Sequence, residues 1–129
     1  MNSKVILIVE DERSLRKAAS MALTEAGYAV IEAGDGVEGL KLAEEKKPDL
    51  ILLDHLMPNM DGLTMLEQLR ATEWGKQLPV IVMTNMQDVN LINRSLVAGA
   101  NDTVLKADMT LEKIVHIINE RLGVQKTEA

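Results

Sequence analysis

The stretch LILLDHLMPNMDG, residues Leu50 to Gly62, decides the fold of this 129-residue chain. Its four leading apolar residues run into Asp54, and such a short apolar run is typical of a strand buried on both faces of a parallel sheet. Pro58 and the following Asp-Gly pair then favour a turn. We therefore expect Asp54 to lie at the carboxyl end of a central strand, where open α/β sheets bind ligands. A simple turn cap is an equally open role for this residue.

The rest of the chain alternates between two hydrophobic patterns. Short apolar runs predict strands at residues 5–9, 28–33, 50–54, 80–83 and 102–105, and apolar residues at helical spacing predict helices at 13–26, 37–46, 63–69, 88–98 and 111–122. This alternation predicts an α/β fold of (βα)₅ type, a three-layer sandwich with right-handed crossovers. Five strands favour the flavodoxin-like order 2-1-3-4-5. Gly27 and Gly99 are predicted to end the first and fourth helices, and Asp88 and Thr110 to cap the fourth and fifth helices. We expect one domain over residues 1–123 and a short polar tail at 124–129.

Composition excludes several classes of function. The formal charge of −6 argues against direct binding to nucleic acid or to anionic lipid. The sequence contains no cysteine, which excludes disulfides, thiolate metal sites and cysteine nucleophiles. No apolar run approaches the roughly 20 residues that a membrane span needs, and the first residues show no secretory pattern. We therefore expect a cytoplasmic protein.

Polar side chains directly follow four of the predicted strands: Glu10 and Asp11, Asp54, Thr84, and Lys106. Because the carboxyl ends of parallel strands meet at one edge of a sheet, these groups should share a cleft. Clustered carboxylates repel one another unless a cation lies among them, and oxygen ligands suit Mg²⁺. A carboxylate can also accept a phosphoryl group, with Lys106 and Thr84 as its charge and hydrogen-bond partners. Taken singly, each residue could equally be an ordinary turn or surface group.

Two other motifs offer alternative sites. Residues 34–39, GDGVEG, match the dinucleotide fingerprint G-x-G-x-x-G, but they follow the second strand and leave Asp11, Thr84 and Lys106 unexplained. His55 and His116 are far apart in the sequence, so we expect solvated or partly packed side chains and no zinc site.

The chain resembles the receiver domains of two-component response regulators (CheY-like) from about residue 4 to residue 122. The matching motifs are VEDE at 9–12, DGVE at 35–38, PDLILLD at 48–54, MPNMDG at 57–62, PVIVMT at 79–84, and GAND at 99–102 leading to Lys106. The resemblance implies that Asp54 accepts a phosphoryl group from a histidine kinase or a phosphotransfer protein. It further implies that Mg²⁺ binds Glu10, Asp11, Asp54 and the backbone carbonyl of Leu56. Thr84 and Lys106 would contact the phosphoryl oxygens.

Besides Glu10, where aspartate is the commoner residue, three positions depart from the family pattern. Thr103 stands where an aromatic switch residue is usual, and it lacks the bulk to rotate inward in the same way. Ala107 stands where proline usually follows the lysine, and we expect a trans peptide there because a cis bond before a non-proline residue costs about 2.5–4 kcal/mol. Asn85 replaces a smaller residue and would lie close to the phosphoryl group.

These features predict a phosphorylation-dependent switch, not a turnover enzyme. One alternative is a pseudo-receiver, the same fold acting as a phosphorylation-independent docking module. A second is an aspartyl-phosphate phosphohydrolase, although such enzymes usually carry a second aspartate where this chain has Leu56. Leu91 and Ile117 lie off the predicted buried stripes, and are either ordinary exposed residues or part of a partner surface. That surface would comprise the helix at 88–98, the strand at 102–105 and the last helix, and would bind a downstream protein or form a weak dimer of an otherwise monomeric domain.

Overall fold

The computed structural model describes residues 3–55, 57, 59–85 and 89–124, without the side chains of residues 89 and 91. The strands are β1 (Val5–Val9), β2 (Ala29–Ala33), β3 (Leu50–Asp54), β4 (Val80–Thr84) and β5 (Asp102–Leu105), and the helices are α1 (Arg13–Glu25), α2 (Gly36–Lys46), α3 (Gly62–Arg70), α4 (Val89–Val97), the 3₁₀ turn η1 (Lys106–Asp108) and α5 (Leu111–Leu122). All five strands are parallel and lie in the order β2-β1-β3-β4-β5. The predicted fold class and strand order are confirmed.

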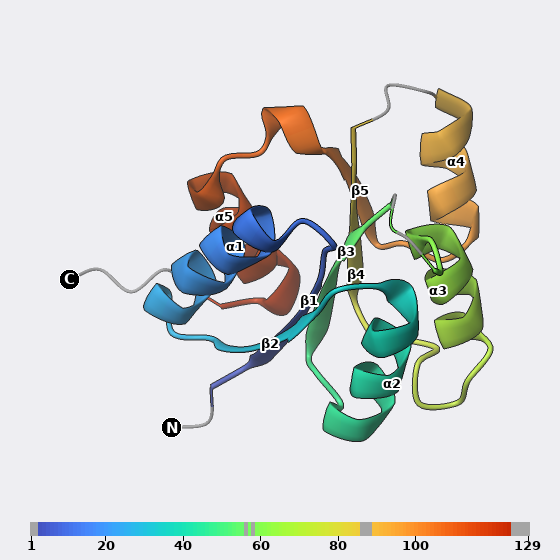
Figure 1. The fold of residues 1–129 in the computed structure, drawn as a ribbon, viewed down its shortest axis with the longest axis horizontal. Helices are drawn as coiled ribbons and strands as arrows, with labels where there is room; N and C mark the ends of the chain where they lie inside the picture. The colour runs from blue at the N-terminus through green and yellow to red at the C-terminus, as the bar shows by residue number, and fades with distance from the viewer. Residues whose placement is uncertain (1–2, 56, 58, 86–88, 125–129) are drawn as a thin grey trace.

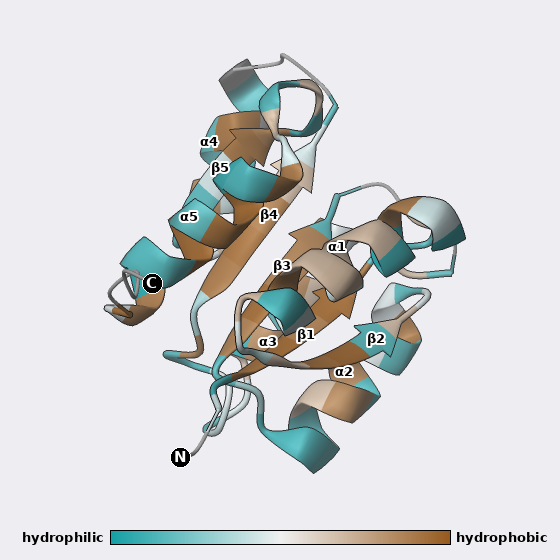
Figure 2. Cartoon of the chain, turned by 90° about the vertical axis from the view of Figure 1, so that its left-hand side faces the viewer, coloured by the Kyte–Doolittle hydropathy of each residue, from teal (hydrophilic) through white to brown (hydrophobic). Residues whose placement is uncertain are grey.

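The sheet is the middle of three layers. Helices α1 and α5 cover one face, and α2, α3 and α4 cover the other (Figure 1). Along β3, Leu50 and Leu52 pack on the side of the sheet that α1 and α5 cover. Ile51 and Leu53 pack on the opposite side, against α2 and α3. This alternation explains the continuous apolar run, because both faces of the strand are fully buried. Figure 2 shows strands that are mostly hydrophobic and helices in which hydrophobic and hydrophilic residues are mixed.

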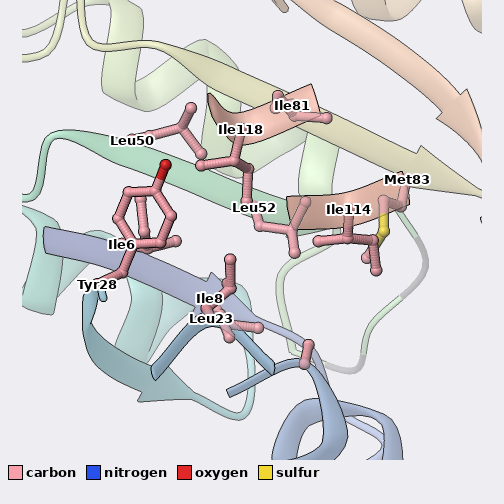
Figure 3. Packing of buried hydrophobic residues seen from close by; sticks show 11 residues of the cluster. Ile6, Ile8, Leu23, Tyr28, Leu50, Leu52, Ile81, Met83, Ile114 and Ile118 are labelled. Atoms are coloured by element: carbon pink, nitrogen blue, oxygen red, sulfur yellow. The ribbon is translucent and has the colours of Figure 1, made fainter. Parts of the chain in front are cut away.

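Aliphatic side chains fill the core beneath α1 and α5. Figure 3 shows Ile6, Ile8 and Leu52 from the sheet packed against Leu23 of α1 and Ile118 of α5. Each such side chain contributes about 1.5–3 kcal/mol to folding when it is fully buried. Tyr28 joins this cluster and its hydroxyl bonds the side chain of Asn119, which ties the start of β2 to α5.

Several helix ends follow the sequence signals. Gly27 and Gly99, expected to stop their helices, have φ angles of +103° and +111°. The predicted cap Thr110 accepts a hydrogen bond from the Lys113 amide at 3.1 Å. The predicted cap of the fourth helix, Asp88, lies outside the described residues. Lys47 ends α2 in the left-handed region with φ +48°, which the sequence did not indicate.

A single guanidinium ties together the edge of the sheet where β4 and β5 begin. Arg70, the last residue of α3, donates to the carbonyls of Gly75 and Leu78 at 2.7 Å each and to that of Gly99 at 2.7 and 3.1 Å. Its Nη2 also lies 3.2 Å from Asn101 Oδ1, which accepts the Val80 amide. The loops that precede both strands are therefore fixed by one side chain.

Candidate functional site

Strand register places the candidate residues side by side. Val9 is paired with Leu53 in the β1–β3 ladder, so Glu10 and Asp54 follow at neighbouring positions. Thr84 is paired with Leu105 in the β4–β5 ladder, and Lys106 follows directly. The predicted convergence at the carboxyl edge of the sheet is confirmed for these residues.

Lys106 bridges the two buried carboxylates. Its Nζ lies 2.7 Å from Glu10 Oε1 and 3.2 Å from Asp54 Oδ1. The Glu10 and Asp54 side chains are 2% and 6% exposed, while that of Lys106 is 14% exposed. Two almost fully buried carboxylates thus share one cation.

This arrangement changes the proton affinities of the site. Burial raises the pKa of Asp54 to about 7, and the charge of Glu10 acts in the same direction while Lys106 partly opposes it. Burial lowers the pKa of Lys106, but its close contacts with Glu10 and Asp54 and the charges of these two residues outweigh this effect and raise it above the ordinary value. Asp54 is therefore costly to ionise as long as no further cation is present.

The donor set fits a hard divalent cation. One carboxylate oxygen from each of Glu10, Asp11 and Asp54 lies within 4.8 Å of the others, and Asp11 is exposed to solvent. Glu10 Oε1 is fully buried and, within the described part of the chain, receives no hydrogen bond of good geometry, although it lies close to Lys106 Nζ. A buried oxygen with spare acceptor capacity beside two further carboxylates is suited to binding Mg²⁺. Leu56, the fourth predicted ligand, lies outside the described residues.

The turn after β3 is shaped by close backbone approach. A Cβ on Gly62 would lie 2.4 Å from the Asp54 carbonyl oxygen, so only glycine fits there. The Gly62 amide donates to the His55 carbonyl at 2.9 Å, and Asp61 Oδ1 caps α3 by accepting the Thr64 amide. This packing explains why an Asp-Gly pair follows the phosphoacceptor candidate.

A cleft of about 410 Å³ opens over these groups. It is lined by Glu10, Asp11, Glu12, Asp54, Asn85 and Lys106. Asn85 is an exposed residue of this lining, and Thr84 is buried at the end of β4. Asp54 is therefore reached from this cleft, beside Lys106 and Asn85.

Thr103 makes a contact that an aromatic residue could not make. Its Oγ1 lies 2.6 Å from Ser95 Oγ on α4, and Ser95 is buried. Because the Ser95 hydroxyl donates its one proton to the Ile92 carbonyl, Thr103 is the donor in this pair. The peptide between Lys106 and Ala107 is trans, as expected from the missing proline.

The expected exposure of Ile117 is wrong. Ile117 is half-buried and packs against the core beneath α1 and α5, because α5 turns a wider apolar face to the sheet than a narrow stripe suggests. Leu91 lies in α4, but its side chain is outside the described residues. Leu96 and Val97 are instead exposed on α4, at 48% and 88%.

The two alternative motifs have structural explanations. Asp35 caps α2 through the Glu38 amide and binds Asn59 Nδ2. A Cβ on Gly36 would lie 2.5 Å from the Met60 carbonyl oxygen, so that glycine serves packing between two loops. His55 is buried, whereas His116 is exposed and pairs with Glu120. Over the described residues, the acidic cluster is the only group with the spacing of metal ligands.

Sequence reasoning missed Arg16. This α1 residue donates from Nη1 to the Glu10 carbonyl at 2.9 Å and from Nε to Glu32 Oε1 at 3.1 Å. The available signal was a basic residue one turn after the acidic pair, but nothing in the sequence shows that it folds back. The η1 turn that carries Lys106 was also not predicted.

Comparison with known proteins agrees with the geometry. The model of the response regulator receiver domain family matches residues 6–119. The response regulator MprA of Mycobacterium leprae is 41% identical over 123 residues, which are 95% of this chain and 53% of that protein. The transcriptional regulatory protein AfsQ1 of Streptomyces coelicolor is 39% identical over 101 residues, 78% of this chain and 44% of that protein. The chain thus spans about half the length of these curated relatives.

Solved structures show the same fold. A putative response regulator from Chloroflexus aurantiacus superposes with a TM-score of 0.87 at 29% identity, covering 95% of this chain and 99% of that one. The chemotaxis protein CheY4 of Vibrio cholerae gives a TM-score of 0.87 at 27% identity, covering 92% and 98%. No helix in the described part is long and apolar enough to cross a membrane. With its acidic cleft, its bridging lysine and a family match over most of its length, the chain belongs to the response regulator receiver domains of two-component systems.

Proposed function

We propose that this domain is a switch that accepts a phosphoryl group on Asp54 from a histidine kinase or a phosphotransfer protein. One observation carries the proposal: Asp54 is buried at the end of β3, 3.2 Å from Lys106 Nζ, with oxygens of Glu10 and Asp11 close by. A carboxylate in this position has a counter-charge and is accessible through the cleft.

In the proposed reaction, an Asp54 carboxylate oxygen forms a bond to phosphorus while the phosphorus–nitrogen bond of a phosphohistidine breaks. The departing imidazole takes up a proton and leaves neutral. Lys106, which now contacts both carboxylates, binds the added negative charge, and Thr84 donates a hydrogen bond to a phosphoryl oxygen. Glu10, Asp11, Asp54 and the Leu56 carbonyl would hold Mg²⁺, which neutralises charge on the transferring group.

The proposed output is binding and not turnover. The domain would catalyse only its own phosphorylation and dephosphorylation, and would signal in the cytoplasm to a downstream protein without contacting nucleic acid itself. The face formed by α4, β5 and α5 is the proposed partner surface. The domain would be a monomer or would form a weak dimer through this face.

Intact mass measured after incubation with acetyl phosphate tests the proposal. We expect a Mg²⁺-dependent gain of one phosphoryl group in the wild type and no gain in Asp54→Asn. Asp35→Asn is the matched control, because Asp35 caps α2 and lies outside the acidic cluster. It should be phosphorylated like the wild type.

Failure of the wild type to gain mass with acetyl phosphate or a phosphorylated donor protein would contradict the proposal. The pseudo-receiver would then be the better account, with partners that bind the unmodified domain. Steady hydrolysis of generic phosphate esters would instead favour the phosphohydrolase.

A further inference from the structure

Arg16 connects the acidic turn to strand β2. Its Nη1 donates to the Glu10 carbonyl oxygen at 2.9 Å, and its Nε donates to Glu32 Oε1 at 3.1 Å. The arginine side chain is only 17% exposed, and that of Glu32 is 24% exposed. One planar guanidinium thus joins a backbone oxygen of the site to a carboxylate on the neighbouring strand.

We propose that Arg16 is a positioning residue, which holds the peptide between Glu10 and Asp11 in the orientation that lets both carboxylates bind Mg²⁺. This inference rests on the proposed function, since it concerns the cation that phosphoryl transfer would use. Arg16 itself contacts neither the cation site nor Asp54 in the described contacts.

The geometry gives the reason. The Glu10 carbonyl belongs to the peptide bond that leads into Asp11, so fixing its oxygen fixes the ψ angle of Glu10 and the direction in which the chain continues to Asp11. The Glu10 amide is fixed by the Ala33 carbonyl at 3.0 Å, and Glu10 Oε2 accepts the Glu12 amide at 3.1 Å. Arg16 supplies the remaining restraint, on the carbonyl itself. Groups behind metal ligands commonly change affinity in this way when they are removed.

Glu32 fixes the guanidinium in turn. Burial raises the pKa of Glu32, but its hydrogen bonds to Lys17 and Arg16 outweigh this effect and lower it below the ordinary value, so the carboxylate stays charged. Lys17 Nζ contacts the other Glu32 oxygen at 3.1 Å, and the lysine side chain is 54% exposed. Lys17 therefore shares the Glu32 partner of Arg16 but, in the described contacts, does not reach the Glu10 carbonyl.

Lys17 is therefore a matched control for Arg16, because loss of charge and loss of positioning are expected to change the Mg²⁺ affinity in opposite directions. Both residues are cations, and removal of a cation near a Mg²⁺ site should strengthen Mg²⁺ binding if charge alone matters. Loss of positioning should weaken it. The charge-conserving Arg16→Lys separates the two effects further, because one ammonium cannot replace the two fixed donor directions of a guanidinium.

The experiment is a calorimetric Mg²⁺ titration of the wild type and of Arg16→Gln, Arg16→Lys and Lys17→Gln. We expect the dissociation constant to rise about tenfold in Arg16→Gln and by a smaller factor in Arg16→Lys. Lys17→Gln should leave it within about twofold or lower it. With acetyl phosphate, the Mg²⁺ concentration for half-maximal phosphorylation should rise in the Arg16 variants, while the rate at saturating Mg²⁺ should recover.

Equal Mg²⁺ affinity in the wild type and Arg16→Lys, or tighter binding by Arg16→Gln, would overturn the inference while leaving Asp54 phosphorylation intact. A wild type that binds no Mg²⁺ would overturn both this inference and the proposed role of the acidic cluster. Melting curves without Mg²⁺ show whether each variant is folded. If Arg16→Gln is unfolded, Arg16→Lys, which retains the charge, still tests the inference.

Discussion

Asp54→Asn should stabilise the domain when Mg²⁺ is absent, although it removes an ion pair. Burial and the nearby Glu10 charge raise the pKa of Asp54 to about 7 from an ordinary 3.8. The folded state therefore holds this proton more tightly than the unfolded state does, and the stability of the wild type falls as pH rises from about 4 to about 7. The amide variant has no such charge to bury, and Lys106 keeps its 2.7 Å contact with Glu10.

The rise of the Asp54 pKa from 3.8 to about 7 sets the size of this stabilisation. It corresponds to about 4 kcal/mol at most, and solvent in the cleft reduces the stabilisation to about 1–2 kcal/mol. For a domain of this size, that raises the melting temperature by about 3–8 °C. Thermal melts in a metal chelator at pH 8 and pH 5 measure it, and the difference between variant and wild type at pH 5 should be about 40% of the difference at pH 8.

Asp35→Asn is a control of opposite sign. The backbone hydrogen bond from Glu38 and the side-chain bond from Asn59 lower the pKa of Asp35, so its charge stabilises the fold above pH 4 and that contribution is lost on acidification. This variant should melt below the wild type at pH 8. If Asp54→Asn also melts at or below the wild-type temperature at pH 8, the three carboxylates are not packed as described.

Four other perturbations test separate parts of the structure. Mg²⁺ at ten times its dissociation constant should stabilise the wild type by about 1.4 kcal/mol. The melting temperature of Asp54→Asn should rise less than that of the wild type when Mg²⁺ is added. Arg70→Ala should lower the free energy of unfolding in urea by about 3 kcal/mol, because several carbonyls lose a charged donor, while acetyl phosphate should still modify Asp54. Thr103→Val should lower it by about 1 kcal/mol through loss of the hydrogen bond to Ser95, and unchanged stability would show that water replaces that bond. Lys47→Gly should raise the melting temperature by relieving a left-handed residue that costs about 1 kcal/mol.

The sequence predicted the fold because its local signals agree with one another. The apolar run before Asp54, the glycine stops at Gly27 and Gly99 and the Thr110 cap all indicate the alternation that the structure shows. The site was predictable for a related reason. Once the strands are parallel, residues that directly follow them must meet at one edge, whatever their own conformational preferences are.

What could not be predicted depends on side chains that reach across elements. Arg16 lies on the polar side of a helix pattern, and only the three-dimensional path of α1 brings it to Glu10 and Glu32. The hydrogen bond between Thr103 and Ser95 joins residues on different elements whose sequence carries no mark of it. Ile117 was misjudged because a helix against a sheet buries more than one narrow stripe.

Arg70 has a consequence for building hybrid proteins. The guanidinium fixes the loops before β4 and β5, whereas Asp54, Thr84 and Lys106 lie where strands end. Loops at the chemical edge can therefore be exchanged with those of a relative without touching the anchor at the other edge. A chimera that takes its β4–α4 and β5–α5 connections from another receiver, with Lys106 kept, should therefore keep its folding cooperativity.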